Sequence, residues 1–454
     1  MTPTAPRSLA PLRFLCLAHF ALALPIRLML AQAPSSADTV GRDAFVRWAR
    51  STAHPLALVD TGGASRTAAY APELRRLTTG ARVVAFGESA HDVHEFIVLR
   101  NQLTDQLIAD DRVSAIVLET GMAEARGIDA WIVGQTDKTP DFAHDLSYGW
   151  GVEQEVIDAL GRLRALNARR PAARRIHFYG MDMPANGGGS LMPALEPVWA
   201  YLAQVDRGAS DRSRAALAPI AQRVASNGYD IVAKFQALGP ARDTLRRELD
   251  ALAAGLDANR RAYVARSSPS RYAWAARLAE VARQTERAVR IGWNDASNPR
   301  DVAMAANVEW ILAREGARGK VVVWAHNLHV ARAPITGPIF ASRGGAPAVT
   351  SMGERLQHSL GAGYVPIGTA FARSMADSSA LESSSVDAAL AMVGVPRFLL
   401  ALDPAPSDAP AAAWVRAAHL KRAEDGYVVT KLVPAFDAVM FIDTVRASRH
   451  VAAP

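Results

Sequence analysis

The chain has 454 residues, of which 50% are hydrophobic and 21% charged, a composition typical of a globular protein. Its formal net charge of +7 falls to +4 without residues 1–33, which hold Arg7, Arg13 and Arg27 and no acidic residue. Because the other basic residues are scattered and do not gather in stripes, we expect no nucleic-acid partner.

Residues 1–33 have the organisation of an export signal. A basic stretch precedes an apolar run at 14–24, and Ala-Gln-Ala at 31–33 is a small-residue cleavage site. We therefore predict a signal peptide and an exported chain, periplasmic or secreted, with no membrane association in the mature form; the alternative is a disordered extension. Cys16 is the only cysteine, so the mature chain would have neither a disulfide nor a cysteine nucleophile.

Helical and extended patterns alternate in the first part of the chain. A helix is expected at 43–50, followed by a turn-rich passage around 61–65. Apolar residues at helical spacing over 94–109 separate apolar runs at 83–86 and 115–118, and the order strand, helix, strand predicts parallel pairing. Further helices are expected at 121–133 and 152–163, and a strand at 176–179.

The character of the sequence changes at 191–290. Strand-like runs vanish there, and helical periodicity with breaks near 206–210, 226–228, 239–240 and 267–269 predicts four or so helices. A helix at 300–315 and strands at 321–324, 364–369, 397–400 and 439–442 then restore the α/β pattern. We predict an α/β fold with a mixed, largely parallel sheet flanked by helices, built from 34–190 and 291–454. The all-helical insertion at 191–290 would form a cleft, as a lid or wall.

Three expected strands end directly on titratable residues. The first leads through Gly87 to Glu88, His91, His94 and Arg100, the second to Glu119, and the third to His326 and His329. In open α/β sheets, ligands bind at the carboxyl ends of the strands. The sequence therefore predicts one crevice in which carboxylates and imidazoles from distant segments meet.

These residue types suit a hydrolase with a histidine base. His91 could take a proton from water, and Glu119 could orient it and stabilise its charged form. Glu88 could hold the water or fix the tautomer of His91. His326 would be a second acid, base or oxyanion donor, and Arg100 would stabilise an oxyanion or pair with Glu88. Singly, each residue also fits a plain structural role, as a cap, a salt bridge or a satisfied histidine.

A metal site and a site without turnover are the alternatives. His91 with His94, and His326 with His329, have the spacing of metal ligands and could hold zinc or manganese together with the neighbouring glutamates. An exported protein that binds a small ligand or a metal without turnover would carry the same crevice. A serine nucleophile is not favoured, because the serine of 87–89 lacks the second glycine of a nucleophile elbow.

The motifs at these strand ends resemble those of the erythromycin esterase family. The family's opening motif, close to Gly-Glu-Ala-Thr-His-Gly followed by His-Glu-Phe and an arginine, corresponds to 87–100 here, and its second acidic position to Glu119. Its Trp-Ala-His-Asn-x-His motif matches 324–329 residue for residue. Landmarks at 180–182, 300–305, 351–353 and 436–438 extend the resemblance over about 80–445.

The resemblance implies a mixed α/β domain and a helical domain around a deep cleft, in which His91 activates water to open an ester or macrolactone. It implies supporting roles for Glu88, Arg100, Glu119 and His326, and no required metal. We also predict contacts to a small-molecule substrate from His329, Asp92 and His94. The sequence departs from the family motif at Ala90 and Asp92, and the carboxylate of Asp92 is expected to raise the pKa of His91 or to alter the pocket.

Overall fold

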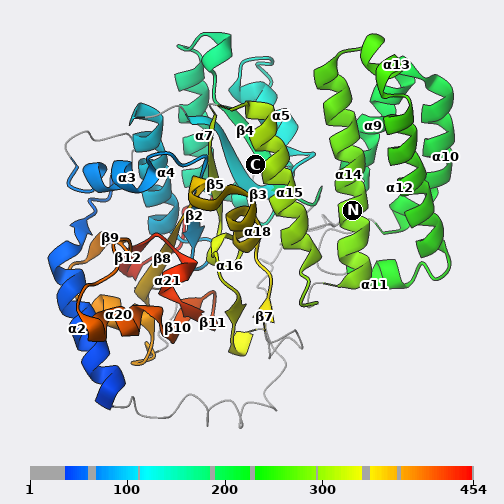
Figure 1. Cartoon of the computed structure of the whole chain (residues 1–454). Coiled ribbons are helices and arrows are strands. Elements are labelled where there is room, and N and C mark those ends of the chain that lie inside the picture. The colour runs from blue at the N-terminus through cyan, green and yellow to red at the C-terminus, as the bar shows by residue number, and fades with distance from the viewer. Residues whose placement is uncertain are drawn as a thin grey trace, which may run out of the picture.

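A mixed sheet of eight strands forms the centre of the described structure (Figure 1). This computed structural model describes residues 36–59, 68–110, 113–184, 190–224, 231–292, 295–317, 319–339, 348–375 and 380–451. The predicted signal peptide at 1–33 and the turn-rich passage around 61–65 lie outside these ranges. Within them, no helix combines the length and the apolar character needed to cross a membrane.

The sheet is largely parallel, as predicted. In spatial order its strands are β1 (His54–Pro55), β9 (Arg397–Ala401), β12 (Ala438–Val445), β8 (Tyr364–Ser374), β2 (Val83–Glu88), β5 (Lys320–His326), β3 (Val113–Gly121) and β4 (His177–Asp182). The strands from β12 to β4 are parallel, whereas β9 is antiparallel to both β12 and β1. The predicted fold class is therefore confirmed, and each predicted strand is present; β1 was not foreseen.

Helices cover both faces of the sheet. One face packs against α3 (Ala71–Thr78), α4 (His94–Asp110), α5 (Ala125–Ile132) and α7 (Gln154–Asn167), and the other against α2 (Ser36–Thr52), α15 (Pro299–Glu315), α18 (Met352–Leu360), α19 (Val386–Ala391) and α20 (Ala409–Arg416). Successive residues of β2 alternate between these two cores: Val84 and Phe86 face α4, and Val83 and Ala85 face the opposite side. Burial on both faces explains the nearly continuous apolar runs of the parallel strands.

Short helical elements connect the longer helices and strands. They are α6 (Phe142–Asp145), η1 (Trp150–Val152), η2 (Ala172–Arg174), α16 (Asn327–Val330), η3 (Gly361–Gly363) and α21 (Leu432–Ala435). The helix expected at 121–133 begins only at Ala125, because Gly121 continues β3 and pairs with Asp182 of β4.

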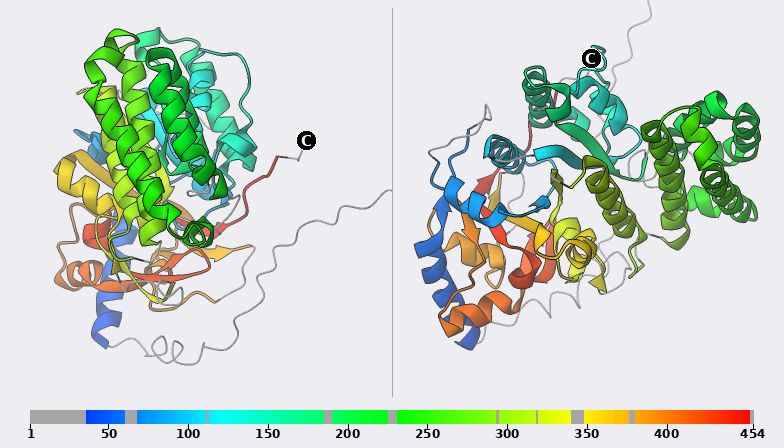
Figure 2. Two further views of the ribbon diagram at one scale, coloured as in Figure 1. Left: turned by 90° about the vertical axis from the view of Figure 1, so that its right-hand side faces the viewer. Right: turned by 45° about the horizontal axis from the view of Figure 1, so that its top comes forward.

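The described residues of 191–290 form helices joined by short turns. These helices are α9 (Met192–Val205), α10 (Arg207–Arg223), α11 (Ile231–Gln236), α12 (Ala241–Ala258), α13 (Arg260–Ala265) and α14 (Pro269–Ile291), more than the four or so helices expected. Figures 1 and 2 show these helices as a lobe beside α15. Trp274 of α14 joins the lobe to the α/β part, since its ring stacks on Tyr179 and contacts Trp310 edge-on. That the lobe forms a lid or wall over the active-site cleft stays a prediction.

A second, antiparallel sheet was not foreseen. Its strands, in spatial order, are β10 (Ala418–Ala423), β11 (Gly426–Lys431), β6 (Ile335–Thr336) and β7 (Ala348–Val349). The hairpin β10–β11 turns over two residues, Glu424 and Asp425, and Glu424 has a φ of 51°. A positive φ at the first position is typical of the tight turns that join two antiparallel strands. This turn is directed at the carboxyl end of β2, because the Glu424 N–H donates to the Ser89 carbonyl at 2.7 Å.

Candidate active site

The carboxyl ends of four adjacent strands bring the predicted polar residues together. In the ladder between β2 and β5, Glu88 is directly opposite His326, and Asp182 ends β4 at the same edge. Glu119 in β3 accepts a hydrogen bond from the His326 backbone N–H at 2.9 Å. The structure therefore places Glu88, Glu119 and His326 in one cluster, as expected for parallel strands that begin far apart in the sequence.

His91 lies at the open side of this cluster. Its Nδ1 is 2.6 Å from Glu88 Oε1, and its ring faces the ring of His326 at a centroid distance of 5.3 Å. The side chain is 31% exposed, so solvent can reach it. Burial of the rest of the ring lowers the pKa of His91, but the hydrogen bond and charge of Glu88 and the charges of Glu119 and Glu424 outweigh it and raise the pKa to about 10.

His326 is held in one tautomer by the backbone. The Leu328 N–H donates to its Nδ1 at 3.1 Å, so in the neutral ring the proton is on Nε2. Nε2 lies 3.1 Å from the Ser89 carbonyl oxygen and 3.2 Å from Glu424 Oε1. In the neutral ring the Nε2–H of His326 therefore faces the Ser89 carbonyl and the Glu424 carboxylate.

Arg100 forms an ion pair with the Glu88 oxygen that His91 does not contact. Its guanidinium is buried between the rings of Trp150 and Trp324, at 5.2 and 4.4 Å from their centroids, and Nη1 is 3.5 Å from Glu88 Oε2. Its nitrogens have no hydrogen-bond partner among the described residues. Burial lowers the pKa of Arg100, opposed by the charges of Glu88 and Glu153. Of the two predicted roles, the geometry favours pairing with Glu88 over direct contact with an oxyanion.

Arg300, which was not among the predicted site residues, joins two strand ends. Its Nη2 donates to Glu119 Oε1 at 2.7 Å and to Asp182 Oδ2 at 2.6 Å. Burial raises the pKa of Glu119, but the charges of His329 and Arg300 outweigh it and hold that pKa well below its usual range. The acid at the end of β4 and the Arg300-Asp301 motif were visible in the sequence, but nothing in it showed that they meet Glu119.

His329 is tied to this charged group. Its Nδ1 is 2.8 Å from Asp301 Oδ1, and its Nε2 is 3.2 Å from Glu119 Oε1. Burial lowers the pKa of His329, but the charges of Asp301 and Glu119 raise it to about 10, so both ring nitrogens carry protons. Arg300 Nη1, 3.2 Å from Nε2, is then a neighbouring cation and not a hydrogen-bond donor to the ring. The intervening carboxylates keep the two cations together.

His94 does not join the cluster around His91. Its side chain is 1% exposed; its Nδ1 is 2.6 Å from Glu155 Oε1, and Arg446 Nη2 lies 2.8 Å from its Nε2. The prediction that His94 contacts substrate has no support in this geometry. Because His91 and His94 take separate carboxylates, their spacing does not create a shared metal site. Among the described residues, no group of three or more His, Cys, Asp or Glu side chains is placed to hold a metal ion.

Asp92 has a buried acid as its neighbour. It lies at a positive φ of 57° and shares a hydrogen bond with Glu153. Burial, this hydrogen bond and the charge of Glu88 raise the pKa of Glu153 to about 9. The carboxylates that chiefly raise the pKa of His91 are Glu88, Glu119 and Glu424. That Asp92 raises this pKa or alters the pocket stays a prediction.

Glu424 is the site residue that sequence reasoning missed altogether. Its Oε1 lies 3.2 Å from His326 Nε2 and 3.7 Å from His91 Nε2, and its side chain is 31% exposed. Burial raises the pKa of Glu424, but the hydrogen bond and charge of His326 and the charge of His91 outweigh it and lower the pKa. The Glu-Asp-Gly at 424–426 is a hairpin signal, but it does not reveal where the hairpin points.

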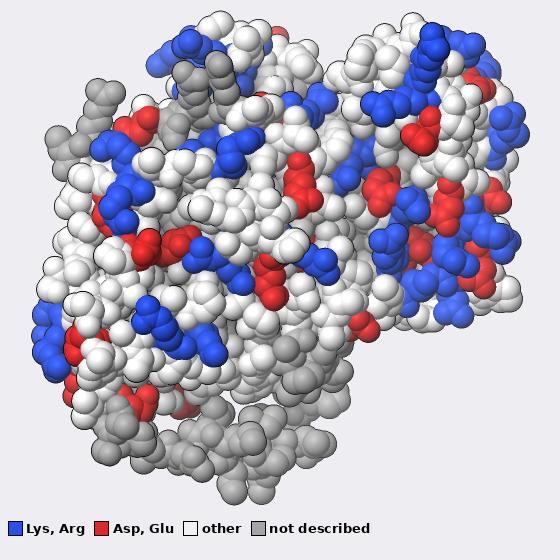
Figure 3. Space-filling view, viewed as in Figure 1, with Lys and Arg blue, Asp and Glu red and all other residues white. Residues whose placement is uncertain are grey.

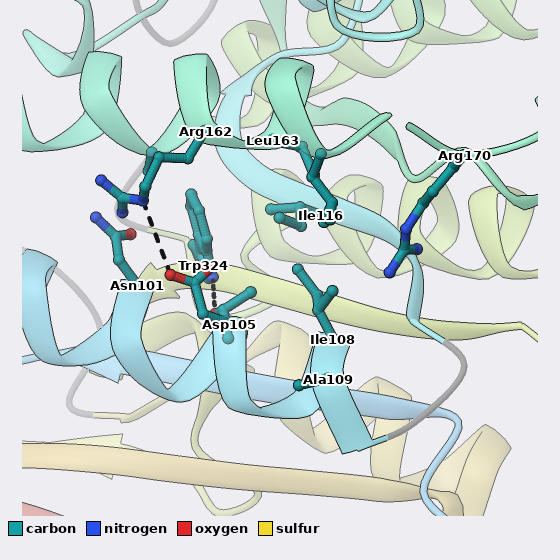
Figure 4. A pocket seen from close by; sticks show the side chains of 12 residues that line it. Asn101, Asp105, Ile108, Ala109, Ile116, Arg162, Leu163, Arg170 and Trp324 are labelled. Atoms are coloured by element: carbon teal, nitrogen blue, oxygen red, sulfur yellow. Dashed lines mark hydrogen bonds and ion pairs between the residues drawn. The ribbon is translucent and has the colours of Figure 1, made fainter. Parts of the chain in front are cut away.

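A separate pocket of about 280 Å³ lies between α4 and α7 (Figure 4). Ile108, Ile116 and Leu163 line it, and Arg162 and Asp105, 3.8 Å apart, form an ion pair at its edge. Trp324 contacts both this pocket and the cluster at the strand ends. Its indole N–H donates to Thr104, which lines the pocket, and its ring packs on Arg100. None of the predicted site residues lines this pocket.

On the face of the molecule shown in Figure 3, basic and acidic side chains are interspersed and form no basic stripe. The cluster at the strand ends is the feature of the described structure that points most clearly to a chemical function.

Two comparisons with known sequences relate the chain to erythromycin esterases. The family model described as erythromycin esterase matches residues 108–445. The erythromycin esterase type II of Escherichia coli is 27% identical over 307 residues, which cover 65% of this chain and 70% of that protein.

Solved structures share the fold. A crystal structure of a Bacillus cereus protein has a TM-score of 0.74 at 20% identity, and one of a succinoglycan biosynthesis protein has 0.73 at 19%; each comparison covers 92% of this chain and 100% of the other. The erythromycin esterase EreC, solved as a variant in its open conformation, has a TM-score of 0.66 at 19% identity, covering 83% of this chain and 94% of that one. With the family model matching most of its length, the chain belongs to the erythromycin esterase family.

Proposed function

We propose that this chain is an exported hydrolase that cleaves a carboxylic ester or a lactone with water activated by His91. The observation that carries the proposal is the pairing of His91 Nδ1 with Glu88 Oε1 at 2.6 Å, opposite the Nε2–H of His326. A carboxylate on Nδ1 directs the other ring nitrogen, Nε2, toward a reactant. The same pair also stabilises the imidazolium that forms when the base takes up a proton.

The reaction would proceed by addition and elimination. Neutral His91 accepts a proton at Nε2 from water, whose oxygen forms a bond to the ester carbonyl carbon. The Nε2–H of His326 leaves its resting acceptors, the Ser89 carbonyl and Glu424, and donates to the oxyanion of the tetrahedral intermediate. When the bond from carbon to the leaving oxygen breaks, His91 returns its proton to that oxygen, so the products are an acid and an alcohol, or one hydroxy acid from a lactone.

The surrounding charges would hold this geometry. Glu119 fixes the end of β5 through the His326 backbone N–H, and Arg100 fixes the second oxygen of Glu88. Because His91 has a pKa of about 10, only a minor fraction of the enzyme has a neutral base at pH 7. We therefore expect kcat/KM to rise with pH until the pH approaches 10.

The substrate class follows from the family and from the site. The Escherichia coli relative is named erythromycin esterase type II, so macrolides are the first lactones to test. The cluster itself requires only a carbonyl carbon within reach of His91 Nε2 and an oxygen within reach of His326 Nε2. Simple esters therefore belong in the same panel.

Replacement of His91 tests the proposal. We expect His91→Asn to lower kcat/KM for the hydrolysed ester by about 10² to 10⁴ while the Tm stays close to that of the parent chain. The control is His144→Asn, because the His144 side chain is 78% exposed on α6 and pairs with its neighbour Asp145. Equal activity of the two variants would contradict a role for His91. A parent chain that binds the whole panel without turnover would instead be a binding protein.

We also propose that the enzyme requires no metal and that the chain is exported. Dialysis against a chelator should leave kcat/KM unchanged, and readdition of zinc or manganese should not raise it. Export should yield a mature chain that begins near residue 34, which N-terminal sequencing of protein from outside the cytoplasm would detect.

A further inference from the structure

The tip of the hairpin β10–β11 places a carboxylate between the two imidazoles of the site. Glu424 Oε1 is 3.2 Å from His326 Nε2 and 3.7 Å from His91 Nε2. His326 directs its Nε2–H outward because the Leu328 N–H occupies its Nδ1. His91 directs Nε2 the same way because Glu88 occupies its Nδ1. Both rings therefore turn the nitrogen proposed to react toward one oxygen of Glu424.

The hairpin holds this carboxylate in a fixed place. The Glu424 N–H donates to the Ser89 carbonyl at 2.7 Å, and the buried Lys421 donates from Nζ to Ser89 Oγ at 2.9 Å. Ser89 Oγ in turn donates to the Thr369 carbonyl at 2.6 Å. Two contacts thus attach the hairpin to the segment between Glu88 and His91. Glu424 has a left-handed backbone with a φ of 51°, which is unusual for a glutamate.

We propose that Glu424 is a positioning residue of the active site, which contacts His326 and His91 and stabilises the imidazolium form of His91. The geometry gives it a different task from that of Glu88, which orients His91 from the far side of the ring. Glu424 faces the nitrogen that exchanges the proton. It therefore favours the protonated form of His91 until the pH is high enough, and so determines the pH range in which the base is free.

The charged groups around His91 define the expected effect. They are Glu88 of the same loop, Glu119 of β3, Glu424 of the hairpin, His326 of β5, and Arg100 of α4, which acts through Glu88. Burial lowers the pKa of His91, and the three carboxylates together raise it to about 10. One opposite charge within about 4–6 Å shifts a pKa by roughly 1–3 units. Removal of the charge on Glu424 should therefore lower the pKa of His91 by about one unit or more.

The test compares Glu424→Gln with Asp425→Asn, its exposed neighbour in the same turn. In each folded chain, the pKa of His91 is measured by NMR titration of the imidazole resonances, assigned with His91→Asn and His326→Asn. This measurement needs no substrate. The kinetic part rests on the proposed function: the acid limb of kcat/KM against pH is recorded for the same variants with the ester found by screening.

We expect Glu424→Gln to move the NMR pKa and the acid limb downward together by about one unit, which is about a tenfold rise in kcat/KM at a fixed pH on that limb. Asp425→Asn should move neither. An unchanged pKa of His91 in folded Glu424→Gln would overturn the proposal, even if activity were lost at every pH. If this variant does not fold, Glu424→Asn decides in its place, because asparagine tolerates the left-handed backbone and is too short to reach His91.

A shift of the NMR pKa in a chain that hydrolyses no ester would support the role of Glu424 and reject the proposed function. The two ideas can therefore fail independently.

Discussion

At the scale of single residues, the site is organised by buried charged side chains that depend on each other as partners. Glu88 is shared by His91 and Arg100, and the side chains of Glu88 and Arg100 are 4% and 3% exposed. A buried charge that loses its partner costs more than the pair contributed, because the remaining charge has no water to solvate it. The contact between Arg100 and Glu88 is therefore expected to matter for folding as well as for orientation of the base.

Replacement of Arg100 should reveal this dependence. We expect Arg100→Met to lower the free energy of unfolding by roughly 3 kcal/mol, measured by chemical denaturation. Arg100→Lys should restore little of it, because lysine lacks the planar group that stacks between Trp150 and Trp324. The control is Arg162→Met, whose ion pair with Asp105 is partly exposed and should contribute less than about 1 kcal/mol. Similar losses in Arg100→Met and Arg162→Met would argue against a supporting role for Arg100.

At the scale of secondary-structure elements, the strand ends bring the site residues together because the chain segments that follow the strands pack closely. The Cβ of an alanine at position 87 would lie 2.7 Å from Val330 Cγ2 and still closer to the side chain of Asn327. These two residues belong to α16, which follows β5 and carries His329. Gly87 is therefore required for β2 and α16 to lie side by side at the site.

Gly87→Ala tests this close packing. We expect it to destabilise the fold by about 2 kcal/mol and to lower activity, because α16 and the imidazoles attached to it must move. Gly161→Ala is the matched control: it lies inside α7 with nothing within 4 Å of an added Cβ. It should stabilise the helix by up to about 1 kcal/mol. Thermal denaturation of both variants compares them directly, and an unaffected Gly87→Ala would rule out the tight contact.

At the scale of the whole molecule, several buried groups make stability depend on pH. The pKa values of His91 and His329 rise from 6.5 to about 10, and that of Glu153 rises from 4.5 to about 9. Between the unfolded and folded values of each group, the folded chain binds more protons than the unfolded chain. The stabilisation by the histidines is complete below about pH 6.5 and is lost as the pH rises through about 10, so stability should fall from neutral pH into the alkaline range.

The contribution of Glu153 to this pH dependence of stability can be tested by itself. Glu153→Gln should leave the Tm nearly unchanged at pH 5 and raise it by roughly 2 °C or more at pH 9, because the folded chain no longer has to hold a proton or a buried charge there. Glu309→Gln on the exposed face of α15 should change the Tm at neither pH. A Tm gain that is the same at pH 5 and pH 9 would show that ionisation of Glu153 is not the cause.

Much of the fold could be predicted from local patterns. The apolar runs that became β2, β3, β5 and β12 are nearly continuous because both faces of a parallel sheet are buried, and the helices between them repeat apolar residues at helical spacing. Strands of two residues, such as β1 and β6, have no such pattern and were missed. The hairpin at 418–431 was also missed, because its strands mix basic and apolar residues.

The candidate site divides in the same way. The sequence by itself determined that Glu88, Glu119 and His326 stand at the ends of parallel strands, because the point where an apolar run stops is a local property. Only the tertiary structure decided that Arg300 joins Glu119 to Asp182, that His94 turns to Glu155, and that Glu424 reaches the two imidazoles. Those contacts depend on strand order and on the packing of segments distant in the chain, which are set by the sum of many small interactions and not by any one stretch of residues.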